Sequence, residues 1–376
     1  MKFIHKDVNR LAELLANSNF DFYACAVTPW HLINIEACIA DLARKSEISG
    51  LIVLNKHVRS GYVLKKNDVV TIDHVKMEVL FQDEIVGRRQ DVGEKNKYDK
   101  PLYIISPMNY LYELGRSVQN KGRKNVYLIR TDEGTMEYYD DHYKMLTNQR
   151  DEQSRRPFIK ERIDQFILKS SMKNWPESAI VDRYLMCKND QGQLTPQKNV
   201  VDSVRNFLNY CGKKIPHKQE SYALFLSFVW EEDKMWDMSE YKNILTMLQR
   251  VLYAKGIKLY VKTHPREKML GKYNEWGIPI FPSENIALEM LLANLDVKPV
   301  AMFGLDSTAL INASMLGNCI SISLKRLVNQ ENCSEVMWVG LETFERYFNG
   351  YVKFVNDESD IVKLLQTSEI KQCEKE

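Results

Sequence analysis

The segment KLYVKTHPRE, residues 258–267, ends an apolar run with side chains that can do chemistry. Lys262 and His264 are two positions apart, so on an extended strand their side chains lie on the same face. Pro265 disfavours the helical conformation for the residue before it, which keeps His264 extended at the end of the strand. An ammonium and a titratable imidazole directed at one point form a candidate binding site for an anion.

Carboxylates and hydroxyls follow other apolar runs. Asp132 and Glu133 come directly after NVYLIRT, and Gly134 then permits a tight turn. Ser307 and Thr308 open a helical pattern after VAMFG, and the N-terminus of a helix with hydroxyl groups favours anions. A carboxylate can accept a proton from a hydroxyl, while cations and a helix N-terminus stabilise a departing anion. The residue types therefore fit group transfer.

Three further residues join these candidates. Ser227 lies at the end of YALFLSF, Glu284 follows a proline and a serine at the start of a helical pattern, and Trp30 follows the first strand. An indole there can stack on a sugar or pack as a helix-start residue. Each candidate also has a structural explanation, such as a solvated turn, a helix cap or a strand residue.

Strand-like and helix-like runs alternate along the chain. Thr28 followed by Pro29 is typical of a helix start, and helical patterns separate most of the strands. This alternation predicts an α/β protein with two parallel sheets, in which ligands bind beyond the carboxyl ends of the strands. The expected strands are residues 22–28, 50–55, 101–107 and 125–131 in the first half, and 222–228, 257–263, 298–304 and 319–324 in the second.

The length of 376 residues suits two domains. A polar, charged stretch from about 140 to 218 interrupts the alternation, and we place the domain change near 212–220. The expected domains are residues 1–215, a Rossmann-like acceptor-side domain with Asp132, and residues 216–376, a Rossmann-like nucleotide-sugar domain with His264.

Composition narrows the class of protein. The 52 basic and 50 acidic residues nearly cancel, which argues against a nucleic-acid binder. The seven cysteines show no CxxC spacing and favour reduced residues in a cytoplasmic protein. No apolar run approaches the ~18 residues of a membrane span. The basic segments 120–124 and 155–162 leave peripheral attachment at the inner face of the membrane as an alternative to a purely solvated face.

Several familiar signatures are missing from the sequence. It has no GxxxxGK[ST], no GxGxxG and no GxSxG. It also lacks a pair of aspartates separated by one residue, the usual metal-holding signature of single-domain nucleotide-sugar transferases. We therefore expect no metal and no cofactor, with cations of the protein itself stabilising the leaving phosphate.

The combination of these candidate residues resembles that of the bacterial sialyltransferases, a group that includes lipooligosaccharide sialyltransferases and capsular polysialyltransferases. That group shares an [DE]-[DE]-G motif, which here is residues 132–134, and a His-Pro motif, which here begins at His264. A Ser-Ser/Thr pair matches Ser307-Thr308, and a glutamate after a proline matches Glu284. The first motif departs from the Asp-Asp form, which leaves open which of its two carboxylates acts.

The resemblance implies a GT-B-type fold, with two Rossmann-like domains whose parallel sheets face an interdomain cleft that binds CMP-sialic acid. Asp132 would be the general base, with Glu133 in support, and His264 would donate to the departing phosphate. The remaining roles concern the nucleotide: Ser307 and Thr308 would hold the phosphate, Lys262 would contact the nucleotide, and Glu284 would accept from ribose hydroxyls or cytosine.

The implied activity is that of an inverting, metal-independent sialyltransferase with CMP-sialic acid as donor. The acceptor would be a hydroxyl of a cell-surface glycan, either lipooligosaccharide or capsular polysaccharide. Two enzymatic alternatives remain open: a GT-B transferase that uses CMP-Kdo or a uridine diphosphate sugar, and a nucleotide-sugar 2-epimerase. A binding factor for surface polysaccharide that has kept the fold is a third, non-catalytic alternative.

Overall fold

The architecture is that of a computed structural model of the chain. It describes residues 2–55, 63–87, 100–107, 110–134, 180–185, 198–199, 201–211, 220–230, 232–282, 286–316 and 319–373. The chain forms two compact units, residues 1–133 with 154–211 and residues 134–153 with 212–376.

The first unit is built on a parallel sheet of seven strands in the order β3-β2-β1-β4-β5-β6-β7. Strand order reverses between β1 and β4, so β1 has neighbours that come later in the chain on both sides. The strands are β1 (Phe22–Ala26), β2 (Ile48–Leu54), β3 (Val75–Phe81), β4 (Leu102–Ser106), β5 (Val126–Thr131), β6 (Ile180–Leu185) and β7 (Lys198–Asn199).

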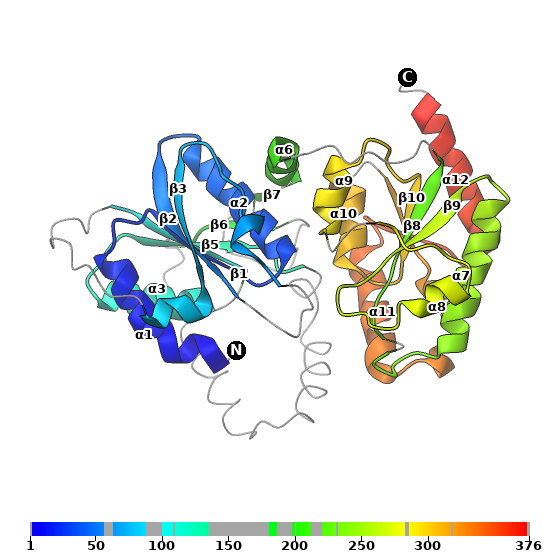
Figure 1. Ribbon diagram of the computed structural model, residues 1–376, viewed down its shortest axis with the longest axis horizontal. Coiled ribbons are helices and arrows are strands. Elements are labelled where there is room, and N and C mark those ends of the chain that lie inside the picture. Colours follow the sequence, from blue (N-terminus) through cyan, green and yellow to red (C-terminus); the bar gives the residue numbers. More distant parts are fainter. Residues whose placement is uncertain are drawn as a thin grey trace. The chain divides into compact units, whose positions relative to one another are not determined.

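Helices cover both faces of this sheet (Figure 1). On one face, α1 (Lys2–Asn17) packs against α3 (Tyr110–Asn120). On the other, α2 (Pro29–Ala43) packs against α6 (Val201–Cys211). Because both faces are covered, the central strands are continuously apolar, as in the fully buried FYACA of β1.

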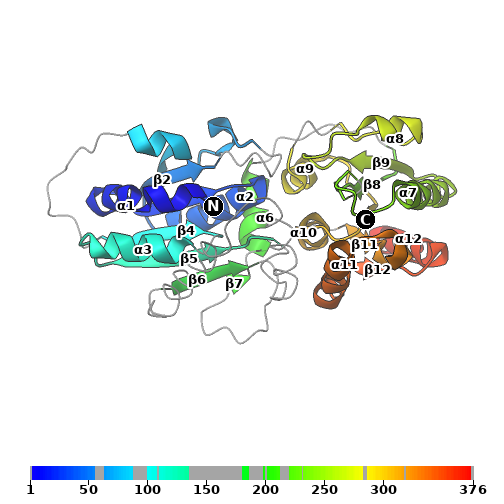
Figure 2. The same ribbon diagram turned by 90° about the horizontal axis from the view of Figure 1, so that it is seen from below.

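The second unit has a five-stranded parallel sheet in the order β12-β11-β10-β8-β9. Figures 1 and 2 show α9 and α10 on one side of this sheet and α7 and α12 on the other. The strands are β8 (Tyr222–Leu226), β9 (Lys258–Lys262), β10 (Ala301–Gly304), β11 (Ile320–Ser323) and β12 (Lys353–Phe354), and the helices are α7 (Met238–Tyr253), α8 (Gly271–Glu275), α9 (Leu288–Asn294), α10 (Thr308–Leu316), α11 (Glu335–Phe348) and α12 (Glu358–Cys373).

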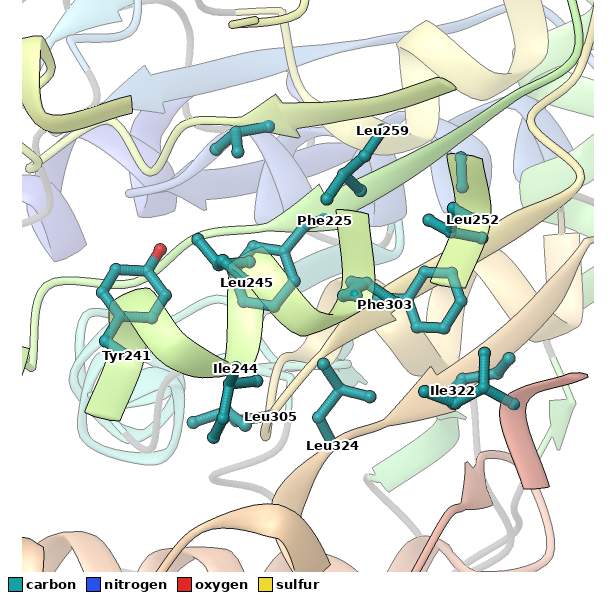
Figure 3. Close-up of a cluster of buried hydrophobic side chains, with 14 of the residues drawn as sticks. Phe225, Tyr241, Ile244, Leu245, Leu252, Leu259, Phe303, Leu305, Ile322 and Leu324 are labelled. Carbon is teal, nitrogen blue, oxygen red and sulfur yellow. The ribbon is translucent and has the colours of Figure 1, made fainter. Parts of the chain in front are cut away.

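The core of the second unit joins the sheet to α7. Phe225 and Phe303 project from neighbouring strands toward Leu245 and Leu252 of the helix (Figure 3). Tyr241 borders the same cluster and its hydroxyl oxygen contacts that of Tyr273 at 2.7 Å. This core fixes the strands whose carboxyl ends carry the candidate site residues.

The sheets confirm the expectation of an α/β chain with two Rossmann-like units. All eight expected strands are present, each within the range predicted from the sequence or within two residues of it. The strands β3, β6, β7 and β12 were not expected. The strand β3 lies at the edge of its sheet, so each of its residues is partly buried or exposed. It therefore lacks the continuous apolar run by which the expected strands were predicted. The expected interdomain cleft stays a prediction.

The sequence raised the question of membrane contact through helices or basic segments. Within the described part of the chain, no helix has the length and apolar character needed to cross a membrane. In the basic segment 120–124, Lys121 and Lys124 are exposed but Arg123 is buried, where its guanidinium donates to the carbonyls of Leu15 and Phe20. Segment 155–162 lies outside the described residues.

A buried carboxyl group lies on α2, the helix that carries Trp30. Glu36 is 2% exposed and accepts a hydrogen bond from the backbone N–H of Val70 at 2.7 Å. Burial raises the pKa of Glu36 from 4.5 to about 8, while the bond from Val70 opposes the rise. Glu36 therefore holds a proton in the folded protein over a range of pH in which the unfolded chain has lost it.

This difference predicts a loss of stability as the pH rises from 4.5 through 8. Burial lowers the pKa of His31 in the same unit from 6.5 to about 4, which gives the opposite trend between those values. Above pH 6.5 the Glu36 effect is unopposed by His31, and we expect the free energy of unfolding to fall by roughly 1–2 kcal/mol up to pH 8. Denaturant titrations of the wild type and of Glu36→Gln measure it.

The Glu36→Gln variant should show a smaller decline over that window than the wild type. Glu47→Gln is the matched control, because Glu47 is exposed and its bond with Lys76 lowers its pKa. It should retain the decline seen in the wild type. An identical decline in Glu36→Gln would show that another group causes it.

Candidate functional site

The candidate residues of the second unit follow three neighbouring strands. Ser227 comes directly after β8, His264 lies two residues after β9, and Ser307 and Thr308 follow β10. Because β8 pairs with β9 on one side and β10 on the other, these carboxyl ends lie at the point where the strand order reverses. That is where open parallel sheets bind ligands.

The hydroxyl group of Ser227 holds the His-Pro loop. Ser227 Oγ accepts a hydrogen bond from the backbone N–H of His264 at 2.7 Å and donates to Oε2 of Glu267 at 2.5 Å. The Ser227 backbone N–H donates to the carbonyl of Lys262 at 3.1 Å. Ser227 thus joins the end of β8 to the loop after β9.

The imidazole of His264 has a defined hydrogen-bond pattern. Its Nδ1 accepts from the backbone N–H of Arg266 at 3.1 Å, so in the neutral ring the proton is on Nε2. Burial lowers the pKa of His264 from 6.5 to about 4, helped by the positive charges of Arg266 and Lys262 and opposed by Asp233. At neutral pH His264 is therefore a neutral ring with Nε2–H as its donor.

Lys262, the last residue of β9, carries a buried ammonium side chain. The residue is 8% exposed, and within the described ranges it forms no ion pair at 4 Å or less. Burial lowers its pKa, while the carboxylate of Glu289 opposes the change. A desolvated ammonium next to His264 favours an incoming negative charge.

Glu289 is a buried acid that links α9 to α10. Its Oε1 accepts a hydrogen bond from Nδ2 of Asn312 at 2.7 Å, and burial raises its pKa. The local sequence around Glu289 reads as an ordinary helical stretch, so we did not predict it. The predicted residue Glu284 lies outside the described residues.

The start of α10 offers backbone N–H groups. Ser307 Oγ accepts from the N–H of Ala309 at 3.2 Å, so this hydroxyl acts as a helix cap. Burial raises the pKa of Asp306 well above its ordinary value, which favours its neutral form beside the helix N-terminus. A neutral carboxyl group there does not repel an anion as a carboxylate would.

Gly134 also belongs to the second unit. Its φ of +103° is in the region that favours glycine. A Cβ at this position would lie 2.9 Å from Oγ1 of Thr308. The backbone of Gly134 therefore lies close to the first residue of α10.

In the first unit, the first turn of α2 contacts Asp132, the predicted catalytic carboxylate. The Nε1–H of Trp30 donates to Oδ1 of Asp132 at 3.2 Å, and both residues are buried. Glu133, the next residue, is exposed. Thr28 sets this turn, because its side chain caps the helix by accepting from the N–H of His31 at 3.2 Å.

His31 contacts the same motif. Its imidazole is hydrogen-bonded to the backbone of Glu133, yet burial lowers its pKa to about 4, so the ring is neutral at pH 7. We did not predict His31 from the sequence; its position next to Trp30 in TPWHL was the available signal. Trp30 and His31 together fix Asp132 and Glu133 from the side of α2.

The structure thus brings Ser227, Lys262 and His264 together in the second unit, and Trp30 with Asp132 in the first. No group of three or more His, Cys, Asp or Glu side chains suited to a metal occurs among the described residues.

Solved structures with a similar fold share little sequence identity with this chain. A Photobacterium sp. 2,6-sialyltransferase, in complex with CMP and lactose, shares 11% identity at a TM-score of 0.46, covering 88% of this chain and 77% of that one. A sialyltransferase from Photobacterium damsela shares 12% at 0.43, covering 89% and 81%. A putative UDP-N-acetylglucosamine 2-epimerase from Listeria monocytogenes shares 9% at 0.46, covering 94% and 98%.

These likenesses are too distant to separate one activity from another. No curated protein sequence matches the chain. A family model does: residues 27–326 match the one described as alpha-2,8-polysialyltransferase (POLYST). The match spans most of the chain and includes the Asp-Glu-Gly, His-Pro and Ser-Thr motifs. The chain therefore belongs to the alpha-2,8-polysialyltransferase family.

Proposed function

We propose that the protein is an inverting, metal-independent sialyltransferase that moves sialic acid from CMP-sialic acid to a hydroxyl of a cell-surface glycan. Membership of the family makes it a glycosyltransferase that acts on polysaccharide. The donor, the inverting course and the kind of acceptor, lipooligosaccharide or capsular polysaccharide, belong to the proposal, as does action at the inner face of the membrane.

One observation carries the assignment: a neutral imidazole with its proton on Nε2 lies beside a buried ammonium at the carboxyl end of β9. Both His264 and Lys262 can meet the negative charge of a departing nucleotide phosphate. An anion there would also raise the pKa of His264, so the ring could donate its hydrogen bond as a cation.

We assign the remaining contacts with the nucleotide from the positions of the residues in the second unit. The start of α10 would bind the phosphate through backbone N–H groups and the hydroxyl of Thr308, with Ser307 shaping the turn as its cap. Glu284 would accept from ribose hydroxyls or cytosine. Gly134 would leave room for the side chain of Thr308, because a Cβ at this position would lie 2.9 Å from its Oγ1.

Asp132 is the proposed general base. Trp30 donates to one of its carboxylate oxygens, and we assign to Trp30 this orienting role besides any contact with a sugar. Glu133, which is exposed, would support Asp132 or interact with the acceptor.

The transfer step then balances as a single displacement. The acceptor hydroxyl gives its proton to the Asp132 carboxylate as its oxygen forms a bond to the anomeric carbon of sialic acid. The bond from that carbon to the phosphate oxygen of CMP breaks, and CMP leaves with the electron pair. The phosphate of CMP is met by His264 and Lys262.

His264 and Asp132 are the two proposed acid–base groups. His264→Ala and Asp132→Ala should each lower turnover by roughly 10²–10⁴-fold, the usual contribution of one positioned acid or base. Initial rates with CMP-sialic acid and a sialylated acceptor measure this, with thermal melting to establish folding. Full activity in either folded variant would remove that residue from the mechanism.

A second prediction concerns Trp30. Trp30→Phe keeps an aromatic ring but removes the N–H that donates to Asp132. We expect kcat to fall by about tenfold, because a misplaced base works less well, while the KM for the donor stays near the wild-type value. A variant with unchanged kcat would show that the hydrogen bond does not orient the base.

A third test identifies the donor. The protein is incubated separately with CMP-sialic acid, CMP-Kdo and uridine diphosphate sugars, each with lactose-type and sialylated acceptors, and products are analysed by mass spectrometry. We expect nucleotide release and a mass increase of one or more sialic acids only with CMP-sialic acid. Turnover of a uridine diphosphate sugar without any acceptor would instead support an epimerase.

A further inference from the structure

We propose that Glu267, a residue without an assigned role, is a positioning residue that holds the His264 loop in its reactive geometry through Ser227. The inference rests on the proposed function, since the role that it supports is the donation from His264 to the leaving phosphate. It also gives Ser227 the role of the link between Glu267 and His264.

Glu267 is a fully buried carboxylate. Its side chain is 0% exposed, and that of its ion-pair partner Lys272 is 5% exposed, with 2.7 Å between Oε1 and Nζ. The hydroxyl of Tyr273 donates to the same Oε1 at 2.5 Å. Oε2 accepts the proton of the Ser227 hydroxyl at 2.5 Å.

The hydrogen bond from Ser227 to Glu267 determines whether the Ser227 hydroxyl can donate to or only accept from other groups. A serine has one O–H proton, and Ser227 gives it to Glu267, so its oxygen can only accept from other groups. The group from which it accepts is the backbone N–H of His264. The backbone N–H of Glu267 in turn donates to the carbonyl of His264 at 2.9 Å. Glu267 therefore controls both backbone polar groups of His264.

Stability alone does not explain a charge in this place. Replacing a buried ion pair by apolar residues of the same volume is often neutral or stabilising. Tyr241, Tyr273 and Trp276 form an aromatic cluster here, and the ammonium of Lys272 lies over the rings of Tyr241 and Tyr273. What an apolar residue cannot do is order the hydroxyl of Ser227 as an acceptor for the N–H of His264.

The test is a double-mutant cycle on turnover of CMP-sialic acid. Glu267→Gln retains the shape but removes the charge, and we expect kcat to fall roughly 10–100-fold, as for a small displacement of a reacting group. Because Glu267 acts through His264, the variant with both Glu267→Gln and His264→Ala should be no slower than His264→Ala alone. Falls that multiply in the double variant would overturn the proposal.

Two further variants distinguish the proposed positioning effect from misfolding and from a general change in the loop. Ser227→Ala removes the hydroxyl link but keeps the ion pair of Glu267 and Lys272, as well as the longer direct contact of 3.4 Å from the His264 N–H to Glu267 Oε2. It should therefore lower kcat in the same direction, with the same lack of additivity with His264→Ala. Glu232→Gln is the matched control. The Glu232 carboxylate accepts from the backbone N–H groups of Lys268 and Met269 on the same loop, but it does not contact Ser227 or His264. It should leave kcat unchanged.

A second readout does not depend on turnover. NMR titration of the His264 imidazole should give a low pKa in the wild type and in Glu232→Gln, and a higher one in Ser227→Ala and Glu267→Gln as the loop relaxes toward water. The charges of Arg266, Lys262 and Asp233, which shift the pKa of His264, are retained in all four proteins. An unchanged pKa in both loop variants would contradict positioning.

The two readouts separate the two proposals. If His264 titrates as expected but no CMP-sialic acid is consumed by the wild type, the proposed function fails and positioning by Glu267 stands. If the wild type transfers sialic acid and the loop variants match it in both kcat and the His264 titration, the inference about Glu267 fails alone.

Discussion

The position of the His264 loop in the second unit depends on a single hydroxyl group. Ser227 Oγ lies between the end of β8 and the loop after β9, and it accepts the backbone N–H of His264 while its proton is committed to Glu267. The loop could satisfy its backbone groups with water, but then the backbone of His264 would not be tied to the end of β8. The hydrogen bonds of Ser227 and Glu267 make the direction of His264 a property of the fold.

The charges around this loop are arranged for an anion that arrives later. Lys262 is desolvated and forms no ion pair within the described residues, His264 is kept neutral, and the neutral form of Asp306 is favoured. A phosphate would therefore meet donors and positive charge in surroundings of low polarity, where such interactions are stronger than in water. The buried acid Glu289 limits the cost of holding Lys262 there before the anion binds.

The sequence predicted the features that local patterns encode. Apolar runs located all the expected strands, and the Thr-Pro pair marked the start of α2, where Thr28 caps the helix. Contacts between distant residues had no such signal. Trp30 and Asp132 are 102 positions apart and Ser227 and Glu267 are 40 apart, so only the fold brings each pair together. For the same reason Glu267 and Glu289 appeared as ordinary acids in polar or helical stretches.

The central claim is that a neutral His264, with its proton on Nε2, meets the phosphate of the nucleotide. Two-dimensional ¹⁵N NMR of the histidine side chains measures it directly, with the His264 signals assigned by comparison with His264→Gln. We expect the Nε2–H form at pH 7 in the free protein and a shift of the Nε2 resonance, with a raised pKa, when CMP is added. A proton on Nδ1, or signals that do not respond to saturating CMP, would contradict it.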